Sequence, residues 1–247
     1  MILARITRAI RTQNWFAVVL EFVIVVAGVL LAFQISQLSE RNAEAARVEA
    51  QIDLVAAEMR ENLERIRSNT RLLEMYNPEL RELRVLLSDY SEEIDTGHLN
   101  RLAINAFTNP TLELELFALE RLEGMDGRQR LSNSGLETAL RVWRGVYDET
   151  KEAESNTQDS IVDTRSGSAF AALSIEALVA AFPSGFGLME PVPSRFETDW
   201  QVLSEDSAFA GHLAIMALHF EYLWAMNQQL EERTQAILDV IEERRRR

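Results

Sequence analysis

The side chains that most often carry out chemistry are scarce in this chain of 247 residues. It has no cysteine and three histidines, at positions 98, 212 and 219. On a helix, His212 and His219 would share a face but lie about 10 Å apart along the axis, too far to hold one metal ion together. Neither has a histidine or carboxylate three or four residues away. We therefore expect structural histidines and predict no metal site.

Signatures of catalysis are also missing. The sequence contains no H-E-x-x-H motif, no P-loop and no G-x-S-x-G motif. Gly185-Phe186-Gly187 follows a predicted helix rather than a strand and lacks a third glycine, so it is no dinucleotide-binding fingerprint. The 39 acidic residues are dense enough for carboxylate pairs to arise by chance. We predict no catalytic residue and no cofactor, and hence a protein that is not an enzyme.

The charge of the chain is distributed unevenly. Arg5, Arg8 and Arg11 precede the first apolar stretch, whereas residues 39–247 carry 22 basic and 38 acidic residues, a net charge of −16. A face that binds phosphates must be basic. The sequence therefore argues against nucleic acid as a partner of the large domain.

The element around which the chain is organised is an apolar stretch. Residues 16–35 are interrupted only by Glu21 and Gln34, and 20 residues of helix cover about 30 Å, the thickness of a bilayer's hydrocarbon core. We predict a transmembrane helix over residues 15–38, with Trp15 as an aromatic anchor at the interface. A cleaved signal peptide is the competing interpretation, but its apolar region would be too long, would contain Glu21 and is followed by no A-x-A-like site.

The flanks of this stretch predict its orientation. Residues 1–14 form a basic segment, either a short amphipathic helix or a disordered tail, while the 20 residues after the span carry only Arg41 and Arg47 among five acidic residues. The positive-inside rule then places the N-terminus in the cytoplasm and residues 39–247 across the membrane. The lipid bilayer is thus the first predicted partner.

A second predicted partner is another membrane helix. Small residues and one carboxyl group recur at helical spacing on one side of the span, and this face comprises Ala17, Glu21, Gly28 and Ala32. Small residues allow close helix approach, and a carboxyl group in lipid needs a partner. The face predicts packing in a homo-oligomer or against another membrane protein. Alternatively, Glu21 lies about 9 Å below Trp15 and is protonated or reaches toward the headgroups.

Residues 14–31, N-W-F-A-V-V-L-E-F-V-I-V-V-A-G-V-L-L, precede a charged helix. This run resembles the N-terminal signature of a family of uncharacterised single-span bacterial membrane proteins. A second family pattern, a small-residue and glycine turn between helices, resembles the segment that includes Leu131, Asn133, Ser134, Gly135, Leu136 and Leu140. The resemblance implies a bacterial inner membrane and a periplasmic helical domain, and no particular chemistry.

Beyond the span, apolar residues repeat in heptads and predict a rod over about 39–76. The seam consists of Val48, Ile52, Val55, Met59, Ile66 and Leu73. Asn62 and Asn69 interrupt it with polar side chains. The seam packs either on later helices of the same chain or in a homo-oligomeric coiled coil, in which the asparagines would set the register.

Asn77-Pro78 is expected to end the rod, and shorter helices should follow. We expect them over about 79–94, 98–107, 111–123 and 136–160, with a buried core helix over 166–182. The loop 183–196 contains Phe186, Leu188 and Met189, which make it either a candidate partner-binding loop or a cap on the core.

The last helix is expected over about 207–243, capped by Ser204 or Asp206. Its length matches that of the rod, so antiparallel packing would return the C-terminus to the membrane. The candidate headgroup contacts are Arg244, Arg245, Arg246 and Arg247; a solvated tail is the alternative. A second span over 208–226 is a rival topology, disfavoured by His212, His219 and Glu221.

These patterns predict an all-α protein, in which one N-terminal transmembrane helix continues into a long rod packed in an elongated multi-helix bundle. The function expected from them is that of a membrane-anchored scaffold or accessory subunit acting by protein–protein interaction. The alternative is a ligand-binding, sensor-like bundle that signals through a membrane partner.

Overall fold

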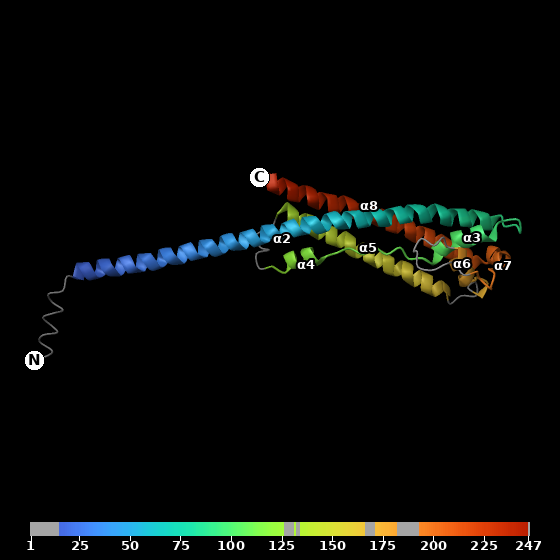
Figure 1. The fold of residues 1–247 in the computed structure, drawn as a ribbon, viewed down its shortest axis with the longest axis horizontal. Helices are drawn as coiled ribbons and strands as arrows, with labels where there is room; N and C mark the ends of the chain where they lie inside the picture. Colours follow the sequence, from blue (N-terminus) through green and yellow to red (C-terminus); the bar gives the residue numbers. More distant parts are fainter. Residues whose placement is uncertain (1–14, 126–130, 132–133, 166–170, 182–192, 247) are drawn as a thin grey trace, which may run out of the picture.

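The computed structural model describes residues 15–125, 131, 134–165, 171–181 and 193–246. This part of the chain forms α-helices and one 3₁₀ helix but no strand, so the predicted all-α class is confirmed. The molecule is elongated (Figure 1), with the N-terminal part of one long helix projecting alone from a bundle. The predicted long rod packed in an elongated bundle is confirmed as well.

Helix α2 runs from Trp15 to Ser88 without interruption, and its 74 residues span about 110 Å. The predicted break at Asn77-Pro78, and with it a separate helix over 79–94, is wrong. A proline inside a helix costs about 3 kcal/mol because it removes one backbone hydrogen bond. Leu80, Leu83 and Leu87 beyond it are buried, each worth about 1.5–3 kcal/mol, so packing outweighs the proline.

Helix α8, Ser207–Arg246, lies antiparallel to α2, and α5, Gly135–Arg165, packs along α8 (Figure 1). Of the two predicted caps of α8, Asp206 is the one used: its Oδ1 accepts from the amides of Ala208 and Phe209 at 2.7 and 3.1 Å. The stretch 208–226, the rival second span, contributes Phe209, Leu213, Met216, Phe220 and Leu223 to the buried core of the bundle. Within the described residues, α2 alone is long and apolar enough to cross a membrane.

The end of the bundle farthest from the projecting helix is built from short helices (Figure 1). These are α3 (Thr96–Ala103), the 3₁₀ helix η1 (Ile104–Phe107), α6 (Ile175–Ala181) and α7 (Trp200–Glu205). The prediction for 98–107 is therefore close. The core helix predicted over 166–182 is wrong for residues 171–174: the carbonyl of Ala172 accepts from the amide of Asp199 at 2.9 Å, and the amide of Ser174 donates to Thr198 Oγ1 at 3.2 Å.

Helix α4 covers only Phe117–Glu123, so the helix predicted over 111–123 is wrong in its first half. The backbone of residues 111–116 bonds to side chains of α2 and α5 instead of to itself, as described below. Helix α5 matches the predicted 136–160 and begins after Ser134, whose hydroxyl accepts from the amide of Glu137 at 3.2 Å.

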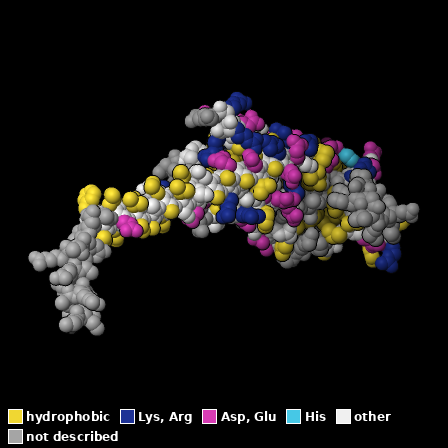
Figure 2. All heavy atoms as spheres, turned by 60° about the vertical axis from the view of Figure 1, so that its left-hand side comes forward, with side chains coloured by type: hydrophobic (Ala, Val, Ile, Leu, Met, Phe, Trp, Pro, Cys, Tyr) yellow, Lys and Arg dark blue, Asp and Glu magenta, His cyan; other side chains and the backbone are white. Residues whose placement is uncertain are grey.

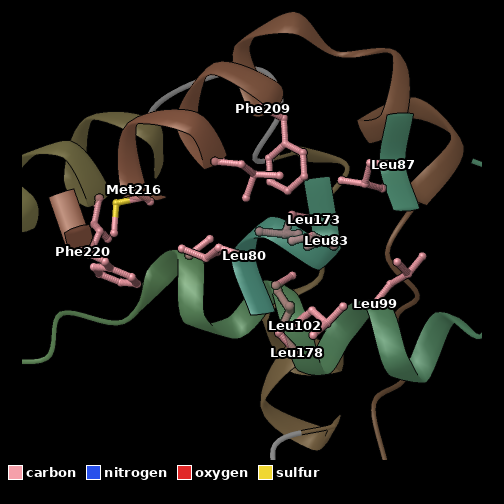
Figure 3. Packing of buried hydrophobic residues seen from close by; sticks show 14 of the residues in the cluster. Leu80, Leu83, Leu87, Leu99, Leu102, Leu173, Leu178, Phe209, Met216 and Phe220 are labelled. Atoms are coloured by element: carbon pink, nitrogen blue, oxygen red, sulfur yellow. The ribbon is translucent and has the colours of Figure 1, made fainter. Parts of the chain in front are cut away.

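The core has two clusters. The proximal core, nearer the projecting helix, gathers the heptad seam of α2 up to Ile66 with α4, α5 and the second half of α8. The distal core gathers α2 from Leu73 onward with α3, α6, α7 and the first half of α8. Figure 3 shows the distal core, in which the leucines of α2 lie between Phe209, Met216 and Phe220 of α8 and the leucines of α3.

Candidate functional site

The projecting part of α2, Phe16–Leu38, is called the bare segment here because no described part of the chain covers it. None of its described side chains is buried; Phe16 is 76% exposed and Ile35 68%. Apolar side chains follow it along its visible face, whereas charged side chains dominate the bundle surface (Figure 2). By length and composition this segment could cross a membrane.

The predicted packing face lies on the bare segment. Glu21, Gly28 and Ala32 follow one side of the helix at 3.6 residues per turn, and Ser36 continues the same side. A Cβ atom added at Gly28 would meet nothing within 4 Å. Within the described residues Glu21 makes no ion pair. The side chains of Ala17 and Trp15, and all of Arg5, Arg8 and Arg11, lie outside what the structure describes.

Nine polar and small residues, Ser39–Arg47, separate the bare segment from the bundle and are called the stalk. The first buried side chain of α2 is Val48. No stalk side chain is buried, and Glu44 and Ala45 are half-buried, so the stalk is a length of largely exposed helix of about 14 Å. Any surface around the bare segment is held apart from the bundle by this distance.

All six predicted seam residues, Val48, Ile52, Val55, Met59, Ile66 and Leu73, are buried to 2% exposure or less. Their neighbours come from α4, α5 and α8 or from the distal helices of the same chain. Of the two alternatives for the seam, packing on the chain's own later helices is the one that the structure adopts.

The asparagines of the seam bind a non-helical segment, residues 109–116, called the strap. Asn62 is fully buried and pairs with both backbone groups of Glu115: its Nδ2 donates to the carbonyl at 2.7 Å, and its Oδ1 accepts from the amide at 2.9 Å. Asn69 Nδ2 donates to the carbonyl of Thr111 at 3.1 Å, and Asn69 Oδ1 accepts from Asn227 of α8 at 2.7 Å. These asparagines hold the strap against α2. Their side chains pair with its backbone amides and carbonyls, as the backbone of a neighbouring strand would in a sheet.

Two side chains of α5 form hydrogen bonds with the backbone of Leu112 in a similar way. The Leu112 amide donates to Glu154 Oε1 at 2.6 Å, and its carbonyl accepts from Lys151, the chain's one lysine, at 3.2 Å.

At the start of α4, two more residues of α2 form hydrogen bonds with the backbone. The amides of Ala118 and Leu119 donate to the two carboxylate oxygens of Glu58 at 2.6 and 3.0 Å, and Gln51 Nε2 donates to the Ala118 carbonyl at 2.8 Å. Burial raises the pKa of Glu58 above its ordinary value, although the two amide hydrogen bonds act in the opposite direction.

Gln51 and Glu58 were missed at the sequence level, where only Asn62 and Asn69 stood out. A signal existed: Gln51, Glu58, Asn62 and Asn69, four of the five buried polar residues of α2, are spaced by seven, four and seven, which places them on one side of the helix. The alternation L-E-L-E-L at 112–116 was the matching signal in the strap, because Leu112 is buried while Glu113 and Glu115 are exposed.

The three histidines make different contacts. His98 Nε2 lies 2.7 Å from Glu82 Oε1, and His212 Nε2 donates to the Ala106 carbonyl at 2.9 Å while its ring stacks on Phe107. Burial lowers the pKa of His212 and of His219. The described residues contain no cluster of three side chains able to hold a metal ion.

The terminal arginines contact α2. Arg244 pairs with Glu49, Arg245 with Asp53, and Arg246 with Glu242 at 3.6 Å. Glu49 follows Leu38 by eleven residues, or about 16 Å of helix. The two arginines that reach α2 are thus engaged with carboxylates at the base of the bundle, beyond the stalk. Arg247 and the loop residues Phe186, Leu188 and Met189 lie outside the described residues.

Comparisons of the chain with protein-family models, with curated proteins and with solved structures find no match. The resemblance of the N-terminal run therefore stays a prediction, and function has to be argued from the geometry.

Proposed function

We propose that this chain is a membrane-anchored accessory or scaffold subunit that acts through protein–protein contacts. In this proposal the bare segment spans the bacterial inner membrane, the N-terminus lies in the cytoplasm and the bundle stands in the periplasm. The observation that carries the proposal is that the bare segment is predominantly apolar on all sides and uncovered.

Energetics argue against water as its surroundings. Fifteen large apolar side chains are exposed between Phe16 and Leu38, and leaving each in water costs about 1.5–3 kcal/mol. Their sum exceeds the net stability of a typical folded domain, about 5–15 kcal/mol. These side chains surround the helix, so one partner helix packed along one face would leave the rest exposed. A bilayer covers every side at once.

Helix continuity favours an anchor over a cleaved signal. Helix α2 passes from the bare segment through the stalk into the bundle without a break. The same helix then contributes Val48, Ile52 and Val55 to the proximal core. The apolar helix is thus an extension of the bundle's own longest element.

Binding of a second membrane helix is supported by the chemistry of one face. In lipid, the Glu21 carboxyl has no described partner in this chain, and an unpartnered polar group there costs free energy. Gly28, Ala32 and Ser36 lie on the same side and let another backbone approach closely. The partner that fits presents a hydrogen-bond donor or a basic side chain at the depth of Glu21.

Substitutions in the full chain, expressed in bacterial membranes with a C-terminal tag, test the proposal. Carbonate washing should leave the chain in the membrane, and protease added outside spheroplasts should digest the bundle. After mild solubilisation and cross-linking, Gly28→Leu and Glu21→Leu should abolish a cross-linked species that wild type forms. Ala27→Leu, an equal change on another side of the same helix, is the control.

Two results would contradict the proposal. The anchor is wrong if carbonate releases the chain or the bundle is protected from external protease. The packing face is wrong if Gly28→Leu and Ala27→Leu behave alike, or if wild type forms no cross-linked species.

A further inference from the structure

A groove of about 610 Å³ lies where the last turns of α2 meet α7 and the first turns of α8. It is called the distal groove. Its volume is within the range of about 300–1,000 Å³ in which proteins bind small molecules. The groove is separate from the bare segment and from the strap, and it shares no residue with either.

The floor of the distal groove is apolar and fixed. Leu87, Leu203, Phe209 and Leu213 line it, and all four belong to the buried distal core. Figure 3 shows Leu87 and Phe209 at this end of the core, where α2 and α8 approach each other. Because these side chains are held by core packing, the floor is preformed and can accept an apolar body at little ordering cost.

The charge at the groove has the opposite sign to the rest of the domain. Its charged lining residues within the described chain are two arginines, Arg81 and Arg84, in a domain whose net charge is −16. Arg84 makes no ion pair with the described residues. Arg81 shares a 3.4 Å contact with Glu221, and both side chains are exposed. Two guanidinium groups one helical turn apart can therefore receive an anion from solution.

We infer that the distal groove binds a small amphipathic anion. Its carboxylate, or a similar anionic group, pairs with Arg84 and Arg81, while its apolar part lies against Val85 and Ala210, the exposed apolar residues of the lining, above the closed floor.

The position of the groove indicates where such a ligand comes from. Arg81 follows Leu38 by 43 residues of continuous helix, or about 65 Å. A lipid in a bilayer around the bare segment cannot reach so far, so the ligand arrives from solution. The inference does not depend on how the bare segment is covered.

Calorimetric titration of the full chain in lipid nanodiscs tests the inference, with octanoate as the probe and empty nanodiscs as the blank. Octanamide, which has the same apolar part and no charge, serves as the matched ligand. We expect octanoate to bind about tenfold more tightly than octanamide, because a charge-assisted hydrogen bond is roughly twice as strong as a neutral one.

Two variants locate the site. Arg84→Gln should weaken octanoate binding about tenfold, and Ala210→Trp, which places a large ring on an exposed lining residue, should abolish it. Arg60→Gln and Ala57→Trp make the same changes at exposed positions of α2 far from the groove and should bind as wild type does.

Equal binding of octanoate and octanamide, or unchanged binding in Arg84→Gln and Ala210→Trp, would overturn the inference. So would the absence of octanoate binding at millimolar concentration, or the finding that a segment of another protein cross-links into the groove. The readout is separate from the cross-linking of the bare segment, so either proposal can fail alone.

Discussion

The two halves of α2 are both rich in apolar residues, yet the structure treats them differently. In the bare segment apolar side chains point in every direction and none is buried. From Val48 onward most of them gather on one side, every seam residue is buried, and the outer side is mainly charged, with Leu54, Met75 and Val85 exposed among the charges. The angular distribution of apolar residues, more than their number, therefore decides whether protein can cover a helix or a second medium is needed.

The halves also differ in their polar residues. The bare segment has one isolated carboxyl group, Glu21. The covered half carries five buried polar side chains, and Asn62 and Glu58 among them each pair with two backbone groups of the strap or of α4. In the covered half, the free-energy cost of burying a polar group is offset by hydrogen bonds to partners in the same chain.

The largest expected effect is a difference in the free energy of unfolding between two variants of α2. Each variant truncates a large apolar side chain to alanine, one in the covered half and one in the bare segment. Met59→Ala should lower the free energy of unfolding by about 2–5 kcal/mol, because Met59 is fully buried in the proximal core. Leu30→Ala should change it by about 0.5 kcal/mol or less, since Leu30 is 58% exposed and belongs to neither core. Denaturant unfolding of the full chain, followed by tryptophan fluorescence, measures both. Equal destabilisation would show that the bare segment is covered by its own bundle.

A smaller effect is expected from the polar side chains that hold the strap. Asn62→Ala leaves the amide and carbonyl of Glu115 unpaired, which should cost roughly 2–4 kcal/mol and speed amide exchange in the strap. Asn42→Ala removes an exposed asparagine from the stalk of the same helix and is the control. If the two variants unfold alike, the strap is held by its leucines and the hydrogen bonds contribute nothing net.

The smallest effect should appear as a pH dependence. Burial raises the pKa of Glu58 in the folded state above the ordinary value of 4.5, so its ionised form is less favourable folded than unfolded. Wild type should be most stable relative to Glu58→Gln near pH 4 and should lose that advantage as the pH rises through the folded pKa.

Denaturant unfolding of the two proteins from about pH 4 to about pH 8 measures this difference. Glu40→Gln, which removes a charge from the exposed stalk, controls for the change in net charge. A difference between wild type and Glu58→Gln that grows with pH would contradict the assigned environment of Glu58.

Local sequence patterns were enough for the long elements. The apolar stretch and the heptad seam predicted two consecutive parts of one rod, and the last helix was placed to within three residues at its end. The seam residues were all identified because burial on a helix follows a period of 3.6. The errors fell at Pro78, at residues 111–116 and at residues 171–174, where the local pattern gave no sign of distant packing or hydrogen-bond partners.

What the sequence by itself determined is therefore which segments are helical and which face of each is apolar. The tertiary structure alone decided that α2 continues through Pro78, that residues 109–116 stay non-helical, and that Arg84 lies over an apolar groove. The reason is physical: the leucines beyond Pro78 are stabilised by α3 and α8, and the strap's backbone is satisfied by side chains some 40 to 60 positions away in the chain. No local pattern encodes a hydrogen-bond partner at that separation.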